Sequence, residues 1–350
     1  MLYGTKNPHG GDIYDREIRY DFSANTNPFG TPEGVKEAMI RALSRVHHYP
    51  DPYCRELVGA ISGFEAVPED YVLCGNGAAE LIYAYCDAVR PKQALELAPT
   101  FSEYSLGLDR VGCSVERYFL KKELDFQPDG DLLRAVEQKK PDVIFLCNPN
   151  NPTGQLLPEG LLRKLLSLCQ QKGIRLFLDE CFLDLTEEGV SMKSALGEHP
   201  ELLILKAFTK SYGMAGVRLG YCMSADSALL TRMSRTVQPW NVSMLAQSAG
   251  VAALGETEFL RNTRALIRRE RAWLKENLEA LGFRVCPSRV NFLLFHGRPG
   301  LCEPLREQGI ALRNCDNYHG LEPGWYRCAV RQRRENQALI TALASLAGKE

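Results

Sequence analysis

The chain has 350 residues, of which 45% are hydrophobic, and its 42 lysine and arginine residues nearly balance its 43 aspartate and glutamate residues. This length exceeds a typical single domain and predicts one large domain with a smaller one. The balanced charge excludes a general attraction to nucleic acid or to an anionic membrane, so that an anionic ligand requires a local site.

The N-terminal residues and the cysteines indicate a cytoplasmic protein. Charges and glycines occupy residues 1–20, where a signal peptide needs an apolar run. No apolar run approaches the roughly 18 residues of a membrane span. The 12 cysteines stand singly, without a CxxC pair or a Cys/His cluster of zinc spacing. We therefore expect free, buried thiols in a reducing compartment, no metal site, and no membrane or nucleic-acid partner.

Short apolar segments alternate with helical patterns from about residue 71 to residue 208. The clearest helical patterns are 78–89 and 159–173, and the expected strands are 71–75, 94–99, 142–147, 174–180 and 201–208. Short apolar runs that are bounded by turns and separated by amphipathic helices are typical of a parallel sheet with both faces covered. The sequence therefore predicts an α/β fold with a mostly parallel sheet.

The pattern changes after about residue 244. A long charged helical segment at 258–281 precedes two expected strands, at 283–295 and 325–331, and a final helix at 333–348. This order is typical of a smaller α+β unit. Because the pair Pro239–Trp240 is the local break in the chain, we expect the domain boundary near residue 240.

Ligands of such sheets bind at the carboxyl ends of the strands, so the residues there are candidates for a site. After the strand at 71–75, Gly75 and Gly77 open a helix, where backbone N–H groups can close on a phosphate. The same glycines fit part of a dinucleotide-binding fingerprint, since Glu96 stands about 20 residues further on, but Glu80 replaces the third glycine. At this point a nicotinamide site stays open beside a simple phosphate site.

Three further strand ends carry polar groups. Residues 148–154 (NPNNPTG) predict a turn whose amides face a ligand, with an Asx-turn as the alternative. Asp179 closes a buried strand, where a carboxylate is costly unless it meets a cation or a strong donor; a structural ion pair is the alternative. Lys210 and Arg218 stand in AFTKSYGMAGVRLGY (207–221), which otherwise suits burial, and snorkelling surface cations are the alternative there.

Together these residue types match the requirements of pyridoxal phosphate. Its phosphate needs backbone donors, a hydroxyl and an arginine, and its ring nitrogen needs a carboxylate. Its phenolic oxygen needs a donor, and its aldehyde needs a lysine. A dinucleotide site uses neither that lysine nor the Asp–Lys pair. The order of phosphate loop, asparagine, aspartate, lysine and arginine along the chain therefore predicts a pyridoxal-phosphate site.

The segments NPNNPTG, LDE and TKSYGMAGVRLGY resemble the signature segments of fold-type I pyridoxal-phosphate enzymes, the aspartate aminotransferase-like superfamily. The resemblance covers essentially the whole chain. It implies a large cofactor-binding domain with a mostly parallel, seven-stranded-type sheet, and a smaller α+β domain made from both ends of the chain. The implied division is 1–45 for the N-terminal arm and part of the small domain, 46–240 for the large domain, and 241–350 for the C-terminal small domain.

The resemblance also implies a role for each residue of the cofactor site. Lys210 would bind the cofactor aldehyde covalently, Asp179 would pair with the ring nitrogen, and Asn151 would donate to the phenolic oxygen. The groups that would hold the phosphate belong to Gly77, Ala78, Ala79, Thr209 and Arg218.

Three aromatic positions complete this comparison. Tyr104, in PTFSEY, matches the residue that stacks on the cofactor ring beside the catalytic lysine and aspartate, with core packing as the alternative. Tyr49, in HHYPD, matches a tyrosine that reaches the neighbouring subunit's phosphate, which implies a homodimer. Phe182 departs from the pattern, because many relatives have a tyrosine there that bonds to the phenolic oxygen.

The reaction depends on how the substrate carboxylate is held, because the bond that lies perpendicular to the cofactor ring is the one that breaks. Arg331, in WYRCAVR, matches the family arginine that binds this carboxylate as a two-pronged fork. A carboxylate near the ring plane leads to transamination, whereas a carboxylate swung out of the plane leaves as CO₂.

Both ends of the chain favour decarboxylation. Three segments are similar to threonine-phosphate decarboxylases of this superfamily: NPHGGDIY with His9, DFSANTNPFG with Asn27, and LRNCDNYHGLEPGWYRCAVR with Arg313. The resemblance implies that Arg313 binds a substrate phosphate and that the rest of the substrate site consists of His9, Asn27, Asn151 and Arg331. We therefore expect decarboxylation of O-phospho-L-threonine to aminopropanol phosphate, a step of cobalamin biosynthesis.

Several alternatives remain at this stage. A disordered terminus is the alternative for His9, and a surface cation is the alternative for Arg313. For the whole protein, the alternatives are a histidinol-phosphate aminotransferase, a non-catalytic binding module on the same fold, and a nicotinamide-dependent dehydrogenase. The intact Lys210 and the lack of a DNA-binding domain in the sequence disfavour the binding module.

Overall fold

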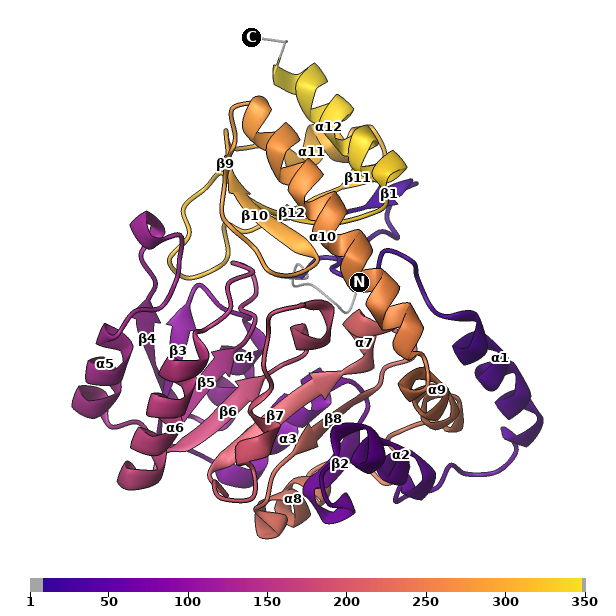
Figure 1. Ribbon diagram of the computed structural model, residues 1–350, viewed down its shortest axis with the longest axis vertical. Helices are drawn as coiled ribbons and strands as arrows, with labels where there is room; N and C mark the ends of the chain where they lie inside the picture. Colours follow the sequence, from indigo (N-terminus) through magenta and orange to yellow (C-terminus); the bar gives the residue numbers. More distant parts are fainter. Residues whose placement is uncertain (1–8, 348–350) are drawn as a thin grey trace.

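A seven-stranded sheet forms the centre of the computed structural model, which describes residues 9–347 (Figure 1). Neighbouring strands pair in parallel except at β8, which is antiparallel to both β2 and β7. This arrangement confirms the mostly parallel sheet expected from the sequence. In spatial order the strands are β2 (Val72–Gly75), β8 (Gly220–Met223), β7 (Leu202–Ala207), β6 (Arg175–Asp179), β5 (Val143–Cys147), β3 (Gln93–Ala98) and β4 (Ser114–Phe119).

Both faces of this sheet are covered, as strand β5 shows. Its Ile144 and Leu146 belong to one buried cluster, whereas Val143, Phe145 and Cys147 belong to another. This division follows from the alternation of side chains along a strand. The first cluster includes residues of α1 (Glu33–Ala42), α2 (Arg55–Glu65), α5 (Asp131–Lys139), α6 (Glu159–Lys172) and α9 (Met244–Leu254); the second includes residues of α3 (Ala78–Val89), α4 (Glu103–Arg110) and α8 (Ser227–Ser234).

Helix α6 shows how the sequence specifies these covering helices. Its buried Leu162, Leu165, Leu166 and Cys169 recur at the spacing that places side chains on one helical face. The helix ends at Gly173, which has φ +66° and therefore the left-handed conformation that glycine adopts without strain. Because parallel strands joined by such helices run in the same direction, their carboxyl ends lie at one edge of the sheet.

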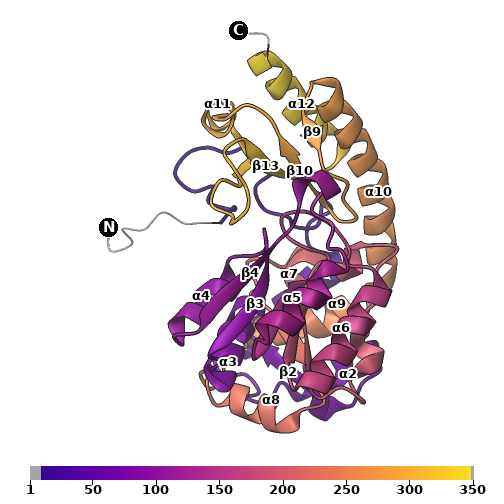
Figure 2. The same ribbon diagram turned by 90° about the vertical axis from the view of Figure 1, so that its left-hand side faces the viewer.

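A smaller part of the molecule lies beyond the carboxyl ends of the parallel strands (Figures 1 and 2). It contains a four-stranded antiparallel sheet and a parallel pair that joins β1 to β11. Because β1 comes from the N-terminal segment, both ends of the chain build this part. Its elements are β1 (Tyr20–Asp21), β9 (Arg284–Val285), β10 (Phe292–His296), β11 (Ile310–Ala311), β12 (Arg313–Asn314), β13 (Trp325–Ala329), α10 (Thr257–Ala280), α11 (Cys302–Glu307) and α12 (Arg333–Ala347).

The remaining helical elements are short. They are α7 (Phe208–Ser211) and the 3₁₀ turns η1 (Leu43–Arg45), η2 (Glu69–Tyr71), η3 (Lys122–Leu124), η4 (Leu183–Leu185) and η5 (Met192–Ala195). Helix α7 directly follows β7, so it stands at the carboxyl edge of the sheet.

The expected division at residues 45 and 240 stays a prediction, and its first eight residues lie outside the described part of the chain. The packing of α9 bears on the second boundary. Its Ala246, Ala249 and Ala253 join the core cluster that contains Val35 of α1 and Leu57 of α2. We therefore propose that the large domain extends to the end of α9 and that the long helix α10 leads into the smaller domain (Figure 2).

Two further expectations concern membrane spans and cysteines. Among residues 9–347, the helices are too short or too polar to cross a bilayer. All of the cysteines are free, and all except Cys302 are buried. The prediction of free, mostly buried thiols is thus confirmed.

Candidate active site

A cavity of about 250 Å³ lies at the carboxyl ends of β5, β6 and β7. Its walls come from four parts of the chain: the N-terminal segment, the start of α3, the strand ends with α7, and the C-terminal part. The lining residues that matter below are His9, Asn25, Ala78, Ala79, Phe101, Asn151, Asp179, Phe182, Thr209, Lys210, Arg218, Arg313 and Arg327.

Most of the residues that the sequence singled out therefore share one cavity. Those that line it are His9, Ala78, Ala79, Asn151, Asp179, Thr209, Lys210, Arg218 and Arg313. Gly77 lies directly against Arg218. Besides Gly77, the four that do not line it are Asn27, Tyr49, Tyr104 and Arg331.

Lys210 is the amine of this cavity. Burial lowers the pKa of its ammonium to about 8, and the positive charge of Arg327 acts in the same direction. The neutral amine, which is the nucleophilic form, is therefore more populated near neutral pH than in an ordinary lysine. Its Nζ lies 5.8 Å from the centre of the Phe182 ring.

Asp179 faces the same cavity and is only 5% exposed. Burial raises the pKa of its carboxyl group above the ordinary value, and two donors oppose this effect. The backbone N–H of Cys181 donates to Oδ1 at 2.9 Å, and the hydroxyl of Tyr104 donates to Oδ2 at 2.6 Å. These bonds fix the orientation of the carboxylate at the end of β6.

The start of α3 forms the opposite end of the cavity. Gly77 precedes the helix with φ +85°, and a Cβ there would lie 2.6 Å from Nη2 of Arg218. A Cβ on Gly220 would lie 2.7 Å from the backbone nitrogen of Ala78. Gly77 therefore permits the close approach of Arg218 to the helix N-terminus, and Gly220 permits that of strand β8. Exposed N–H groups and the helix dipole at this N-terminus favour an anion.

The expectation for Arg331 does not fit the structure. This guanidinium is directed at the N-terminal segment, where it donates to the carbonyl oxygens of Asp21 and Ala24 and to Oγ1 of Thr26. Residue 331 lies beyond the end of β13 at Ala329, so the strand no longer directs its side chain towards the cavity. Arg331 instead ties the two ends of the chain together.

Arg327 takes the position expected for Arg331. It lies within β13 and lines the cavity, where Nη1 donates to Oδ1 of Asn151 at 2.5 Å and Nη2 donates to the carbonyl of Ser23 at 2.8 Å. Its buried Nε has no hydrogen-bond partner among residues 9–347. The sequence signal was present, since WYRCAVR contains both arginines, but the end of the strand was not evident.

Asn27 also lies away from the cavity. It is 1% exposed, and its Nδ2 donates to the carbonyl of Ser211 at 2.7 Å and to Oγ1 of Thr263 at 3.0 Å. Asn25, two residues earlier, lines the cavity instead. Its buried Oδ1 has no hydrogen-bond partner within the described residues. Of these two asparagines, Asn25 therefore faces the cavity and Asn27 does not.

Tyr104 stands behind Asp179 and not over the cavity. The residue is fully buried, and its ring lies 5.4 Å from that of Phe145 in the core beneath the sheet end. Phe101, at the start of the same PTFSEY segment, lines the cavity. The stacking position that the sequence suggested for Tyr104 thus fits Phe101.

The remaining two residues, His9 and Arg313, come from the two ends of the chain. His9 lines the cavity, and its Nε2 lies 2.5 Å from Oε1 of Glu103. Arg313, in β12, donates from Nη2 to Oδ1 of Asn317 at 2.7 Å. Arg313 thus joins Arg218 and Arg327 among the guanidinium groups that line the cavity.

Tyr49 is on the outer surface, with 77% of the residue exposed. Its ring stacks on that of Trp240 at a centroid distance of 4.6 Å. Within one chain it contributes nothing to the cavity.

The fold and this cavity define the class of the protein, and comparison with known proteins identifies the family. Residues 18–343 match the model of the aminotransferase class I and II family. The chain belongs to this family, as its motifs led us to expect.

Individual relatives point in two directions. Threonine-phosphate decarboxylase of Salmonella typhimurium is 35% identical, with 97% of this chain and 96% of that protein covered. Histidinol-phosphate aminotransferase 1 of Cupriavidus pinatubonensis is 33% identical, with 92% of this chain and 86% of that protein covered. The crystal structure of the histidinol-phosphate aminotransferase from Clostridium acetobutylicum superposes with a TM-score of 0.88 at 26% identity, over 95% of this chain and all of that one.

Proposed function

We propose that this protein is a pyridoxal-phosphate-dependent decarboxylase of O-phospho-L-threonine. The single observation that carries the proposal is the joint placement of Lys210, Asp179, Arg327 and Arg313 in one cavity. The first two are the groups that the cofactor requires, and the two arginines suit a substrate with two anionic groups. The relative from Salmonella typhimurium, similar over nearly the whole chain, supports the same substrate.

The cavity fits the cofactor. The glycine-lined approach of Arg218 to the start of α3 leaves room for a phosphate, which the N–H groups of Ala78 and Ala79 and the hydroxyl of Thr209 would also bind. Asp179 would hold the ring nitrogen in its protonated form, and Lys210 would bind the aldehyde. Bound there, pyridoxal phosphate supplies an electron sink for the electrons released at the substrate Cα.

The phenolic oxygen of the cofactor would bond to Asn151. The Oδ1 of this residue already accepts a bond from Arg327, so its Nδ2 is the group that can donate. Phe182 has no hydroxyl to donate, so the amide of Asn151 would be the donor to the phenolic oxygen.

The substrate carboxylate would bind to Arg327, whose unpartnered Nε provides a donor beside Nη. The substrate phosphate would bind at the wall formed by Arg313 and His9. These two contacts fix the substrate at both ends, and binding energy from the remote phosphate can then hold the carboxylate in the orientation for loss of CO₂. Lys210 Nζ would afterwards deliver the proton at Cα, and aminopropanol phosphate would leave.

The assay is incubation of the purified enzyme with phosphothreonine as the only substrate. We expect one CO₂ for each aminopropanol phosphate formed. Formation of a keto acid that requires added 2-oxoglutarate would contradict the proposal and favour histidinol-phosphate aminotransferase, the second candidate, which the 33% identical relative supports.

We further propose that the enzyme is a homodimer in which Tyr49 reaches the phosphate of the neighbouring site. Large apolar side chains are exposed around Tyr49, on α1, on the residues before α2 and near Pro239, where a monomer would leave them in water. They belong to Ile40, Leu43, Val46, Tyr53 and Trp240.

A further inference from the structure

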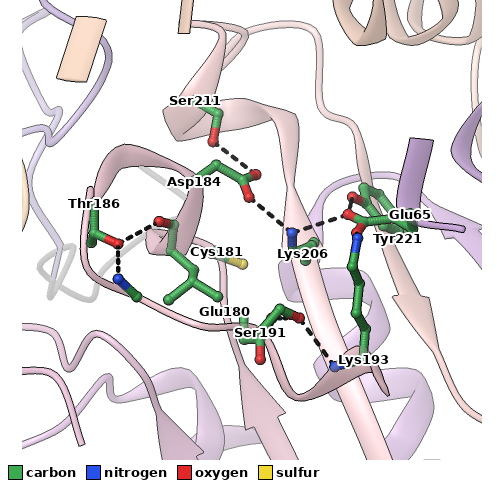
Figure 3. A network of polar contacts seen from close by, with 12 residues as sticks. Glu65, Glu180, Cys181, Asp184, Thr186, Ser191, Lys193, Lys206, Ser211 and Tyr221 are labelled. Atoms are coloured by element: carbon green, nitrogen blue, oxygen red, sulfur yellow. Dashed lines mark hydrogen bonds and ion pairs between the residues drawn. The ribbon is translucent and has the colours of Figure 1, made fainter. Parts of the chain in front are cut away.

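A buried network of charged residues surrounds Lys206 of β7 (Figure 3). At its centre Lys206, only 4% exposed, donates to Oε1 of Glu65 at 3.0 Å and to Oδ1 of Asp184 at 2.8 Å. Glu65 also accepts bonds from Lys193 and Tyr221. The proposed reaction uses none of these side chains.

Stability alone does not explain such a network. Desolvation of buried ions costs several kcal/mol per ion, and apolar side chains of similar size serve at least as well in many cores. Here the ion pairs favour the charged forms of Lys206 and Glu65. Burial opposes the charge of Lys206, but Asp184 and Glu65 hold the pKa of its ammonium above the ordinary value.

The network alternates along the chain with residues of the cavity. Lys206 is followed by Ala207, which lines the cavity, and Ser211 follows Lys210. Glu180 follows Asp179 and is held by Oγ of Ser191 at 2.6 Å. Since successive strand residues point to opposite sides, Lys206 lies on the face of β7 opposite Ala207. The network thus contacts segments that also carry cofactor residues.

Helix α7 depends on such contacts. It has four residues, which is too few to satisfy its own backbone groups or to be stable alone. Ser211 is fully buried and is held from two directions: its Oγ donates to Oδ2 of Asp184 at 3.4 Å, and its carbonyl accepts from Nδ2 of Asn27 at 2.7 Å. These two bonds connect α7 to η4 and to the N-terminal segment.

We propose that Asn27 and the Asp184–Lys206 pair are positioning residues for Lys210. By holding Ser211 from both sides they fix the backbone of α7, and with it the place from which Lys210 Nζ meets the cofactor aldehyde. This gives Asn27, which does not line the cavity, a structural role in positioning Lys210. The inference rests on the proposed attachment of the cofactor to Lys210, but it does not depend on which reaction follows.

The test measures how fast the cofactor attaches to Lys210. Holoenzyme is treated with a small competing amine, the amine is removed, and the absorbance of the covalently attached cofactor is followed as it returns. The variants are Asn27→Ala, Asp184→Asn and Ser211→Ala, and thermal unfolding is recorded for each. We expect attachment to slow by roughly ten- to a hundred-fold, because a displacement of about 1 Å has effects of this size.

Two matched controls separate positioning from general damage. Thr263→Val removes the other acceptor of Asn27, and Ser191→Ala removes a bond within the network that does not reach α7. We expect both to attach the cofactor at the wild-type rate even where they unfold at a lower temperature. Should Asp184→Asn fail to fold, Ser211→Ala still decides, since it removes a single hydroxyl.

Two results would overturn the inference: wild-type attachment rates in Asn27→Ala and Ser211→Ala, or equal slowing in the two controls. Failure of the proposed function looks different. In that case the wild type releases no CO₂ from phosphothreonine while its cofactor attaches normally, and the attachment assay remains readable. A wild type that never binds pyridoxal phosphate covalently would overturn both.

Discussion

The hydroxyl of Tyr104 donates to Oδ2 of Asp179 over 2.6 Å in a fully buried setting. The backbone N–H of Cys181 also donates to the carboxylate of Asp179, at Oδ1. Both act against burial, which raises the pKa of this carboxyl group. The charge that the proposed cofactor requires at its ring nitrogen therefore depends on a tyrosine that does not touch the cavity.

Tyr104→Phe is expected to destabilise the charged carboxylate of Asp179 while the cofactor stays bound. Loss of a hydrogen bond to a charged group costs about 1.5–3 kcal/mol, and the pKa of Asp179 would rise further because the Tyr104 bond lowers it. The carboxylate is then lost at a higher pH as the solution is acidified. We expect a lower kcat whose acid limb moves to higher pH, measured as a pH profile, with the cofactor still bound. An unshifted acid limb would show that Tyr104 serves core packing alone.

The two arginines of WYRCAVR should separate in kinetics and stability. Arg327→Lys keeps the charge but removes the fork, and we expect kcat/KM to fall by roughly ten- to a hundred-fold, the equivalent of one charged hydrogen bond. Arg331→Gln removes bonds to the N-terminal segment, so its main effect should be a lower unfolding temperature. The reverse pattern would restore the role first expected for Arg331.

These arginines also show what a sequence can specify. Asp179, Lys210 and Arg218 were predicted to meet because parallel strands carry their ends to one edge, and the structure brings them into one cavity. Their roles there stay predictions. The positions that differ were decided by local geometry: β13 ends at Ala329, two residues before Arg331.

The same limit applies to the two remaining corrections. Asn25 and Asn27 have the same residue type, and only the packing of the N-terminal segment on α7 decides which one faces the cavity. Phe101 and Tyr104 are separated by the start of α4 at Glu103, and this helix turns Tyr104 into the core. Motifs indicate the segment, whereas the exact residue depends on where an element begins or ends.

Attachment of pyridoxal phosphate should depend on pH through Lys210 itself. Because burial and Arg327 lower its pKa to about 8, the attachment rate should rise with pH up to about 8 and then level off. Arg327→Met removes a positive neighbour, which favours the ammonium form and raises the pKa. The rise should therefore move to higher pH in this variant. Attachment rates measured across the pH range check this prediction. An unchanged profile in Arg327→Met would show that the charge of Arg327 does not lower the pKa of Lys210.

His9 should be held at the cavity by Glu103. The imidazole contacts Oε1 at 2.5 Å, while the hydroxyl of Tyr83 donates to Oε2 at 2.9 Å. The bond with His9 is the main reason that the pKa of Glu103 lies below its ordinary value. Because the pKa of Glu103 is lower in the folded protein than in the unfolded chain, the contact stabilises the fold at any pH above the unfolded pKa. This stabilisation is lost as the pH falls through the lowered, folded-state pKa.

Glu103→Gln should therefore release His9 at neutral pH. We expect a higher KM for phosphothreonine, little change in kcat, and faster proteolysis near residue 10. Tyr83→Phe serves as the control, because it removes the other bond to Glu103 and leaves the contact with His9 in place. A KM that falls in Glu103→Gln would show the opposite role, in which Glu103 competes with the substrate for His9.

Tyr49 offers a test of the proposed dimer that needs both subunits. It is 77% exposed and does not line the cavity of its own chain, so in the proposed dimer it would act on the second copy. Tyr49→Ala and Lys210→Ala should each be nearly inactive as pure dimers. In a mixed dimer, one site combines an intact Lys210 with an intact Tyr49 from the other subunit, while the second site lacks both. We therefore expect each heterodimer formed on mixing to have about half of the activity of a wild-type dimer, the share of one site in two. No recovery, in mixtures shown by mass to contain the heterodimer, would mean that Tyr49 does not act across the interface.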